Sequence, residues 1–210
     1  MKFYAMIALL CAGIAGNAQA HEVWIERDAA GPARIYLGEP GEPLPAGGDP
    51  EFAQLKAPRL LGDAQPALVR KAGFLEAQVP AGDVRAWDDN VFAPWGEAGK
   101  KEGVVYYARA GRAEAAARLP FEIVPVAANA NRFRLVRDGK PLPATKVTVI
   151  TPDKWSKAFT TDAAGEVTVA IREKGRYLLS AATKEDGAAT LPGGAVTAVH
   201  HITTTSFTAE

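Results

Sequence analysis

The sequence predicts an all-β protein built from two antiparallel β-sandwich domains. Apolar residues alternate with polar ones at a period of two along most of the chain, which is typical of half-buried strands. The 20 glycines and 15 prolines interrupt these apolar stretches at short intervals, so most of the stretches are too short to be helices. In the last part of the chain, five to six such stretches fall within about 80 residues, which matches a small antiparallel sandwich.

The first 20 residues are expected to be a cleaved secretory signal peptide. Lys2 supplies a positive charge ahead of the apolar run at residues 3–16, and that run is too short to be a stable membrane anchor. Ala18 and Ala20 are the small residues that a signal peptidase recognises, so cleavage after Ala20 makes His21 the first residue. Lipoprotein processing at Cys11 is disfavoured, because a leucine precedes it. We therefore expect export to the periplasm.

Removal of residues 1–20 changes the chemistry that the chain can offer. Cys11, Met1 and Met6 leave with the signal, so the mature chain would have no sulfur ligand and no disulfide. Of the 24 basic residues only Lys2 would be lost, which leaves 23 basic against 24 acidic residues. A nearly neutral protein of this kind is not suited to bind nucleic acid or an anionic membrane surface.

The first predicted domain covers residues 21–125. Its expected strands lie at residues 21–26, 33–37, 66–70, 73–80, 103–110 and 119–126. Residues 38–50 contain four prolines and four glycines and predict a long loop, either mobile or forming a rim over a site. Residues 56–61 and 111–119 look partly helical, although the second segment also fits a bulged connection between strands.

The second predicted domain covers residues 126–210, after a boundary near residues 124–132. A strand over 131–137 should turn at Asp138-Gly139 and lead into a further strand that ends near residue 150. Residues 156–171 predict a hairpin that turns between Asp162 and Gly165. A strand at 175–183 and a long threonine-rich strand at 195–210 complete the pattern.

The three histidines are the main candidates for a functional site. His21 lies at the predicted start of the mature chain, and His200 and His201 lie near its end. The free amine and ring Nδ1 of an N-terminal histidine can chelate one metal ion, and a further imidazole would complete a histidine brace. A nitrogen-rich tetragonal site of this kind favours Cu(II), followed by Ni(II). The alternative is that His21 is a terminal residue without a role.

His200 and His201 cannot both bind the metal without a bulge, because neighbours on a strand point to opposite faces. His201 shares its predicted face with Thr203, Thr205 and Phe207. The residues alone leave both His200 and His201 open as the second protein ligand. This arrangement requires the first strand to lie beside or over the last one.

The chain also resembles the NikM-like periplasmic proteins. The resemblance is carried by "AHEVWIE" after the signal, "LPFEIVPVA" in mid-chain and "LVRDGKPLPATKVTVITP" with the "FTTDAAGEVTVAIREKGRYLLSAA" that follows. It extends over essentially the whole mature chain. It implies a periplasmic component of nickel or cobalt uptake with two β-sandwich domains, the second Ig-like, transthyretin-like or like a carboxypeptidase regulatory domain. It also places a histidine six residues before the aromatic of the final strand, which matches His201. From this resemblance we expect His201 to be the second protein ligand and keep His200 as the alternative.

The sequence therefore favours an exported protein that is not an enzyme and that holds copper, or nickel or cobalt. Its expected partners are the metal ion and a metal transporter or an outer-membrane receptor. One alternative is a metal-free Ig-like surface- or carbohydrate-binding module. Another is a copper-dependent oxidative enzyme, since such enzymes also begin with a histidine on a β-sandwich, although a fold alone does not indicate an activity.

Overall fold

A computed structural model describes residues 21–62 and 65–210 of the chain. The predicted signal peptide therefore lies outside the described residues. The strands are β1 (Glu22–Glu26), β2 (Ala33–Gly38), β3 (Arg59–Leu60), β4 (Leu68–Arg70), β5 (Leu75–Ala77), β6 (Val84–Asp88), β7 (Glu102–Ala110), β8 (Phe121–Pro125), β9 (Arg132–Arg137), β10 (Lys140–Pro141), β11 (Lys146–Ile150), β12 (Ser156–Thr160), β13 (Glu166–Thr168), β14 (Gly175–Leu191) and β15 (Gly194–Ala209).

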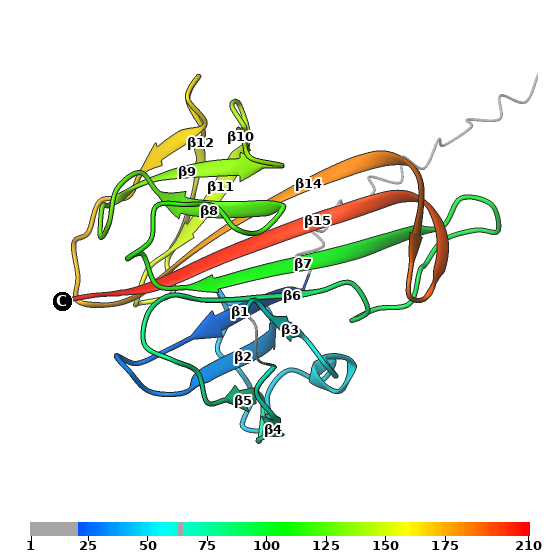
Figure 1. Cartoon of the computed structure of the whole chain (residues 1–210), viewed down its shortest axis with the longest axis horizontal. Helices are drawn as coiled ribbons and strands as arrows, with labels where there is room; N and C mark the ends of the chain where they lie inside the picture. The colour runs from blue at the N-terminus through cyan, green and yellow to red at the C-terminus, as the bar shows by residue number, and fades with distance from the viewer. Residues whose placement is uncertain (1–20, 63–64) are drawn as a thin grey trace, which may run out of the picture.

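The predicted all-β class is confirmed, and the structure is a β-sandwich built around one large sheet (Figure 1). This central sheet has seven strands in the order β12-β11-β14-β15-β7-β6-β3. Its middle pair, β7 and β15, runs parallel, with His200 opposite Val104 and Thr204 opposite Ala108. The expectation of purely antiparallel sheets is therefore wrong, because β7, in the middle of the chain, pairs in parallel with the last strand.

The predicted division at residues 125 and 126 is not confirmed. The central sheet takes β3, β6 and β7 from before that point and the other four strands from after it. Hydrogen bonds between β7 and β15 join the two halves along nine residue pairs, from Ala198 with Glu102 to Ser206 with Ala110. The two halves therefore share a sheet.

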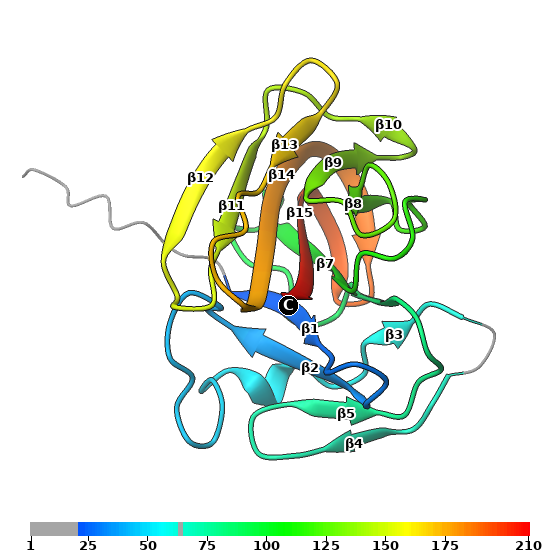
Figure 2. The ribbon, with the colours of Figure 1, turned by 90° about the vertical axis from the view of Figure 1, so that its left-hand side faces the viewer.

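Two smaller sheets cover the two faces of the central sheet, as the end view of Figure 2 shows. The lower sheet has the order β1-β2-β5-β4, and its apolar side chains pack with those of β6, β7 and β15. The upper sheet contains β8, β9, β10 and β13, and it packs with β7, β11, β14 and β15. Two separate apolar cores result, one on each side of the central sheet.

The segment 156–171 does not form the predicted hairpin. Its turn is present, since the Gly165 N–H donates to the Asp162 carbonyl over 2.9 Å. However, β12 pairs with β11 in the central sheet, whereas β13 pairs with β9 in the upper sheet. The turn therefore carries the chain from one layer to the next, which local alternation alone does not distinguish from a hairpin.

The hydroxyl-rich part of β15 binds the small sheets to both faces of the central sheet. On the lower face, the Thr204 hydroxyl donates to the Val23 carbonyl over 2.8 Å, and the Ser206 hydroxyl donates to the Ile25 carbonyl. On the upper face, the Thr205 hydroxyl donates to the Ile123 carbonyl over 2.7 Å. These bonds join main-chain carbonyls of β1 and β8 to side chains of β15 and so link the three layers.

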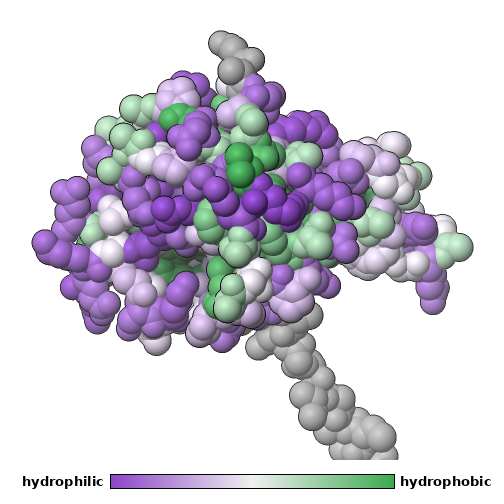
Figure 3. Space-filling view, turned by 90° about the horizontal axis from the view of Figure 1, so that it is seen from below, coloured by the Kyte–Doolittle hydropathy of each residue, from purple (hydrophilic) through white to green (hydrophobic). Residues whose placement is uncertain are grey.

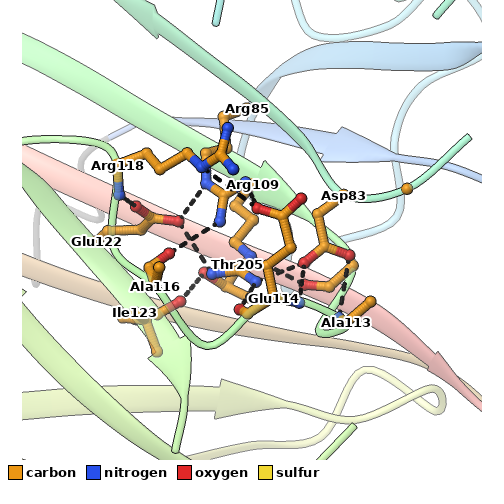
Figure 4. A network of polar contacts seen from close by, with 12 residues as sticks. Asp83, Arg85, Arg109, Ala113, Glu114, Ala116, Arg118, Glu122, Ile123 and Thr205 are labelled. Carbon is orange, nitrogen blue, oxygen red and sulfur yellow. Dashed lines mark hydrogen bonds and ion pairs between the residues drawn. The ribbon is translucent and has the colours of Figure 1, made fainter. Parts of the chain in front are cut away.

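A buried ion network fastens β8 to the central sheet (Figure 4). Arg109 on β7 and Glu122 on β8 are fully buried, and their Nη1 and Oε1 atoms lie 3.0 Å apart. Arg85 on β6 donates from Nε to the same Glu122 oxygen over 2.7 Å. The second Glu122 oxygen accepts the main-chain N–H groups of Arg118 and Leu119 at 2.7 and 2.9 Å. Each Glu122 oxygen therefore has two donors.

The two segments predicted as partly helical are not helices. Residues 56–61 contain the short strand β3, and residues 111–119 form turns that lead into β8. Within 21–62 and 65–210, the only helix is the single 3₁₀ turn η1, Phe52–Gln54. No helix in these ranges has the length and apolarity to cross a membrane.

Candidate metal centre at the start of the first strand

His21 lies immediately before β1, beside two carboxylates. Its ring Nε2 is 3.1 Å from Oδ1 of Asp49 and 3.7 Å from Oε2 of Glu51. The edge of the ring meets Phe92, with 6.2 Å between ring centroids. The imidazole is therefore held between a loop and an aromatic side chain while about a quarter of it, 28%, stays exposed to solvent.

The loop that follows β2 is fastened where it brings Asp49 to His21. Its residue Gly48 has φ +87° and passes so close to Gly73, between β4 and β5, that neither residue has room for a Cβ. Asp49 then accepts the main-chain N–H of Glu51 on Oδ1 at 2.7 Å, and its carbonyl accepts the N–H of Phe52 at 2.9 Å. The carboxylate position is thus set by the local backbone.

The contact with Asp49 determines which ring nitrogen of His21 is available to bind a metal ion. A carboxylate can only accept hydrogen bonds, so the Nε2 of His21 is the nitrogen that carries the proton and donates to Asp49. In the neutral ring, Nδ1 then keeps its lone pair. Histidines that bind metals commonly have their other ring nitrogen fixed by a carboxylate in this way.

His200 lies on the face of the central sheet that the lower sheet covers, the same side as His21. Its side chain, however, contacts other residues than His21. Residues 202, 204 and 206 of β15 face the lower sheet, and His200 follows the same alternation. Its Nε2 lies 2.6 Å from Oε2 of Glu102, and its ring lies 5.6 Å from that of Trp95. Hydrogen bonds from His200 and then Lys184 lower the pKa of Glu102. His200 is therefore held in an ion-pair cluster of its own.

His201 points to the opposite face, so the structure does not bring it to His21. Its ring stacks on that of Tyr107 at 6.0 Å, and its Nδ1 is 3.3 Å from the tyrosine hydroxyl. Its Nε2 lies 3.5 Å from Oε2 of Glu185. The central sheet separates this residue from β1. The preference for His201 over His200 as the partner of His21 is therefore wrong, because the odd-numbered residues of this part of β15 face the upper sheet.

The three imidazoles consequently do not assemble into a brace. In residues 21–62 and 65–210, no group of three or more His, Cys, Asp or Glu side chains is arranged to hold a metal ion. Side chains alone therefore do not provide a centre near His21. A metal site here depends on the main-chain amine that cleavage before His21 would release, together with ring Nδ1.

Glu22 is a buried acid next to His21 that the sequence reading missed. Part of the residue reaches solvent, but its carboxylate is buried against β14, where Oε1 accepts from the Ser180 hydroxyl over 2.5 Å. Its Oε2 has no hydrogen-bond partner in the described part of the chain. Burial raises the pKa of Glu22 to about 7, against the lowering effect of the Ser180 bond. The alternation of Glu22, Trp24 and Glu26 resembles a solvated strand face, so the sequence contains no signal for this burial.

The burial of His201 predicts a measurable pH dependence of stability. Burial, and then the charge of Arg137, lower the pKa of His201 to about 4 from its usual 6.5. The stability that His201 gives as a neutral ring is therefore complete above pH ~6.5 and is lost as the pH falls toward ~4.

We expect a His201→Gln variant to lose less stability than the parent chain between pH 7 and pH 4. Urea unfolding at both pH values, in a chelating buffer, measures this difference. Equal losses in the two proteins would contradict the expectation, because other titrating groups act equally in both.

Comparison with known proteins identifies one family. A family model described as "Domain of unknown function (DUF4198)" matches residues 66–185, which is more than half of the chain. The match runs across residues 125 and 126, in keeping with the shared central sheet. It does not include His21, His200 or His201. No curated protein and no solved structure matches the chain.

Proposed function

The chain belongs to the DUF4198 family, whose function is unknown, and we propose that it is an exported metal-binding protein with His21 as its first residue. The proposed site consists of the His21 amine and ring Nδ1, which chelate one divalent transition metal ion. The proposal includes signal cleavage, a periplasmic location and a role in holding or transferring the ion rather than in catalysis. A metal transporter or an outer-membrane receptor would be the protein partner.

The observation that carries the proposal is the 3.1 Å contact between His21 Nε2 and Asp49 Oδ1. The contact uses the ring nitrogen that a chelate with the amine does not need, and it leaves Nδ1 free on the backbone side of the ring. Such a bond also fixes the ring orientation and increases the basicity of the ligating nitrogen. Asp49 is accordingly a positioning residue for the metal site.

The donor set favours copper. Two nitrogen donors, the amine and the imidazole, suit Cu(II) best among divalent first-row metals. Ni(II) is next in the same order, with Co(II) below it. The nickel or cobalt uptake that the NikM-like resemblance implies is therefore a less favoured version of this proposal. His200 and His201 have no part in it.

The Asp49→Ala variant tests the positioning role. Removing the carboxylate frees the His21 ring and its second nitrogen, so we expect Cu(II) affinity to fall by about 10–100-fold. Asp49→Asn keeps an acceptor oxygen and should bind with intermediate affinity. Both are measured by calorimetric titration at pH 7 on metal-free protein whose first residue is confirmed by mass spectrometry to be His21.

The matched controls are His201→Ala and Asp186→Asn. His201 faces the other side of the central sheet, and the Asp186 side chain is 85% exposed on the β14–β15 hairpin, so neither change should alter the Cu(II) affinity. An Asp49→Ala protein that is folded and binds copper as well as the parent chain would remove the support for this site.

A further inference from the structure

A second candidate site lies at the β12 edge of the central sheet, away from His21. A pocket of about 430 Å³ opens between the turn and strand at residues 151–159, on one side, and residues 168–173, on the other. Its floor is apolar and consists of Val149, Phe159, Val169 and Tyr177. The end view in Figure 2 shows β12 as the outermost strand, followed by β11 and then β14. A pocket of this size can hold one or two rings of a small ligand.

An exposed tryptophan stands at the rim of this pocket. Trp155 is 59% exposed, whereas Trp24 in the core is 2% exposed, so packing within the chain does not account for its position. The turn before it is well fastened: the Thr151 N–H donates to the Trp155 carbonyl at 2.9 Å, and Lys154 adopts a left-handed φ of +69°. Lys154 is held in turn by its Nζ bond to the Pro40 carbonyl at 3.0 Å. The indole is therefore presented on a rigid support.

The opposite wall is fastened by a buried tyrosine. The Tyr177 hydroxyl accepts the main-chain N–H groups of Arg172 and Glu173, each at 3.2 Å, and donates to the Glu173 carbonyl at 3.2 Å. Three hydrogen bonds to one hydroxyl keep this segment in place. Both walls of the pocket are thus formed before any ligand binds, which lowers the entropic cost of binding.

The polar groups around the pocket are balanced in charge. Two anions, Asp153 and Glu173, and two cations, Lys157 and Arg172, line it. In the described part of the chain, none of the four takes part in an ion pair. The rim therefore offers hydrogen-bond donors and acceptors together, without a net charge that would select an anion or a cation.

We propose that this pocket binds a neutral saccharide, with one pyranose ring stacked on Trp155 and its hydroxyl groups bonded to the charged rim. A sugar ring has an apolar face that suits an aromatic surface and hydroxyls that both donate and accept, and this combination matches the pocket. An extended peptide fits less well. The pocket is lined by side chains from one face of β12, whereas a peptide that extends the sheet needs the main-chain groups at the strand edge.

The test uses the full mature chain with three neutral probes: maltohexaose, cellohexaose and N-acetylchitohexaose, each up to about 5 mM so that millimolar dissociation constants are detected. Tryptophan fluorescence and calorimetry are recorded in EDTA, so the result is independent of the proposed metal site. We expect at least one probe to bind. Trp155→Ala should weaken that binding about tenfold or more, and Trp155→Phe should restore part of it.

Trp95→Ala is the matched control, since Trp95 is 43% exposed beside His200, and it should leave the sugar affinity unchanged. The proposal is overturned if none of the three sugars binds, or if the folded Trp155→Ala variant binds as well as the parent chain. A neutral Thr-Val-Thr-Val-Thr peptide is titrated in parallel. Its Trp155-dependent binding, with no sugar binding, would assign the pocket to a peptide instead.

Discussion

A Glu122→Gln variant is expected to lose about 3–5 kcal/mol of folding free energy, the cost of removing one member of a buried ion network. Glu122 is fully buried and receives Arg85 and Arg109, which are 3% and 0% exposed in their side chains. The amide has nearly the same shape as the carboxylate, so the variant removes the charge and adds little strain. It removes the counter-charge that the two buried guanidinium groups share, so that Arg109 keeps only Asp83 and Arg85 keeps only Glu114 as ion-pair partners among the described residues. It also places an amide NH₂ near donors.

This loss is large relative to the 5–15 kcal/mol by which most domains are stable. Urea unfolding followed by circular dichroism measures it, with the slope against urea used to check that the same surface unfolds. Asp186→Asn is the control, because its ion pair with Lys184 is exposed, and such pairs contribute about 1 kcal/mol or less. A Glu122→Gln protein within 1 kcal/mol of the parent chain would mean that the network does not hold β8 in place.

The surface below the lower sheet is mostly hydrophilic. Figure 3 shows this side of the molecule, where hydrophilic residues predominate and apolar ones form small scattered areas. The most exposed large apolar side chain in the described residues is Trp155, at the pocket near β12. This distribution fits the two sites proposed above.

Local sequence patterns predicted most of the strands but not how the strands pair. Alternation located β1, β2, β7, β8 and β15 to within a few residues, because burial of one strand face leaves a period-two signal. The parallel pairing of β7 with β15 joins residues about 100 positions apart, and no local signal encodes such a contact. For the same reason, the sequence did not predict that β13 pairs with β9 in the upper sheet instead of with β12.

The candidate site was predictable in part. The position of His21 after Ala20 identified the possible chelate, and the alternation of β15 correctly placed His200 and His201 on opposite faces. The alternation did not show which face of the central sheet β1 covers. In the structure, the hydroxyls of Thr204 and Ser206 bond to β1, and these bonds form only when the two layers pack together. Asp49 was missed because it lies in a proline- and glycine-rich loop, where an aspartate is an ordinary turn residue.

The second large effect is expected from one added acetyl group. Acetylating the His21 amine converts it into an amide and brings no new amine, so the imidazole is left as the single strong donor. Because two linked donors bind far more tightly than one, Cu(II) affinity should fall by about a hundredfold or more. The contact between His21 and Asp49 involves only side chains, so acetylation of the amine should leave the fold and the ring orientation intact.

The central claim is tested most directly by comparing the Cu(II) affinity of the chain that begins at His21 with that of the same chain acetylated at its His21 amine, both at pH 7. Both proteins are purified without metal, checked by mass spectrometry and titrated under identical conditions. The account predicts one tightly bound Cu(II) ion in the first protein and a dissociation constant about a hundredfold or more higher in the second. Equal affinities would contradict it and would show that the His21 amine takes no part in metal binding.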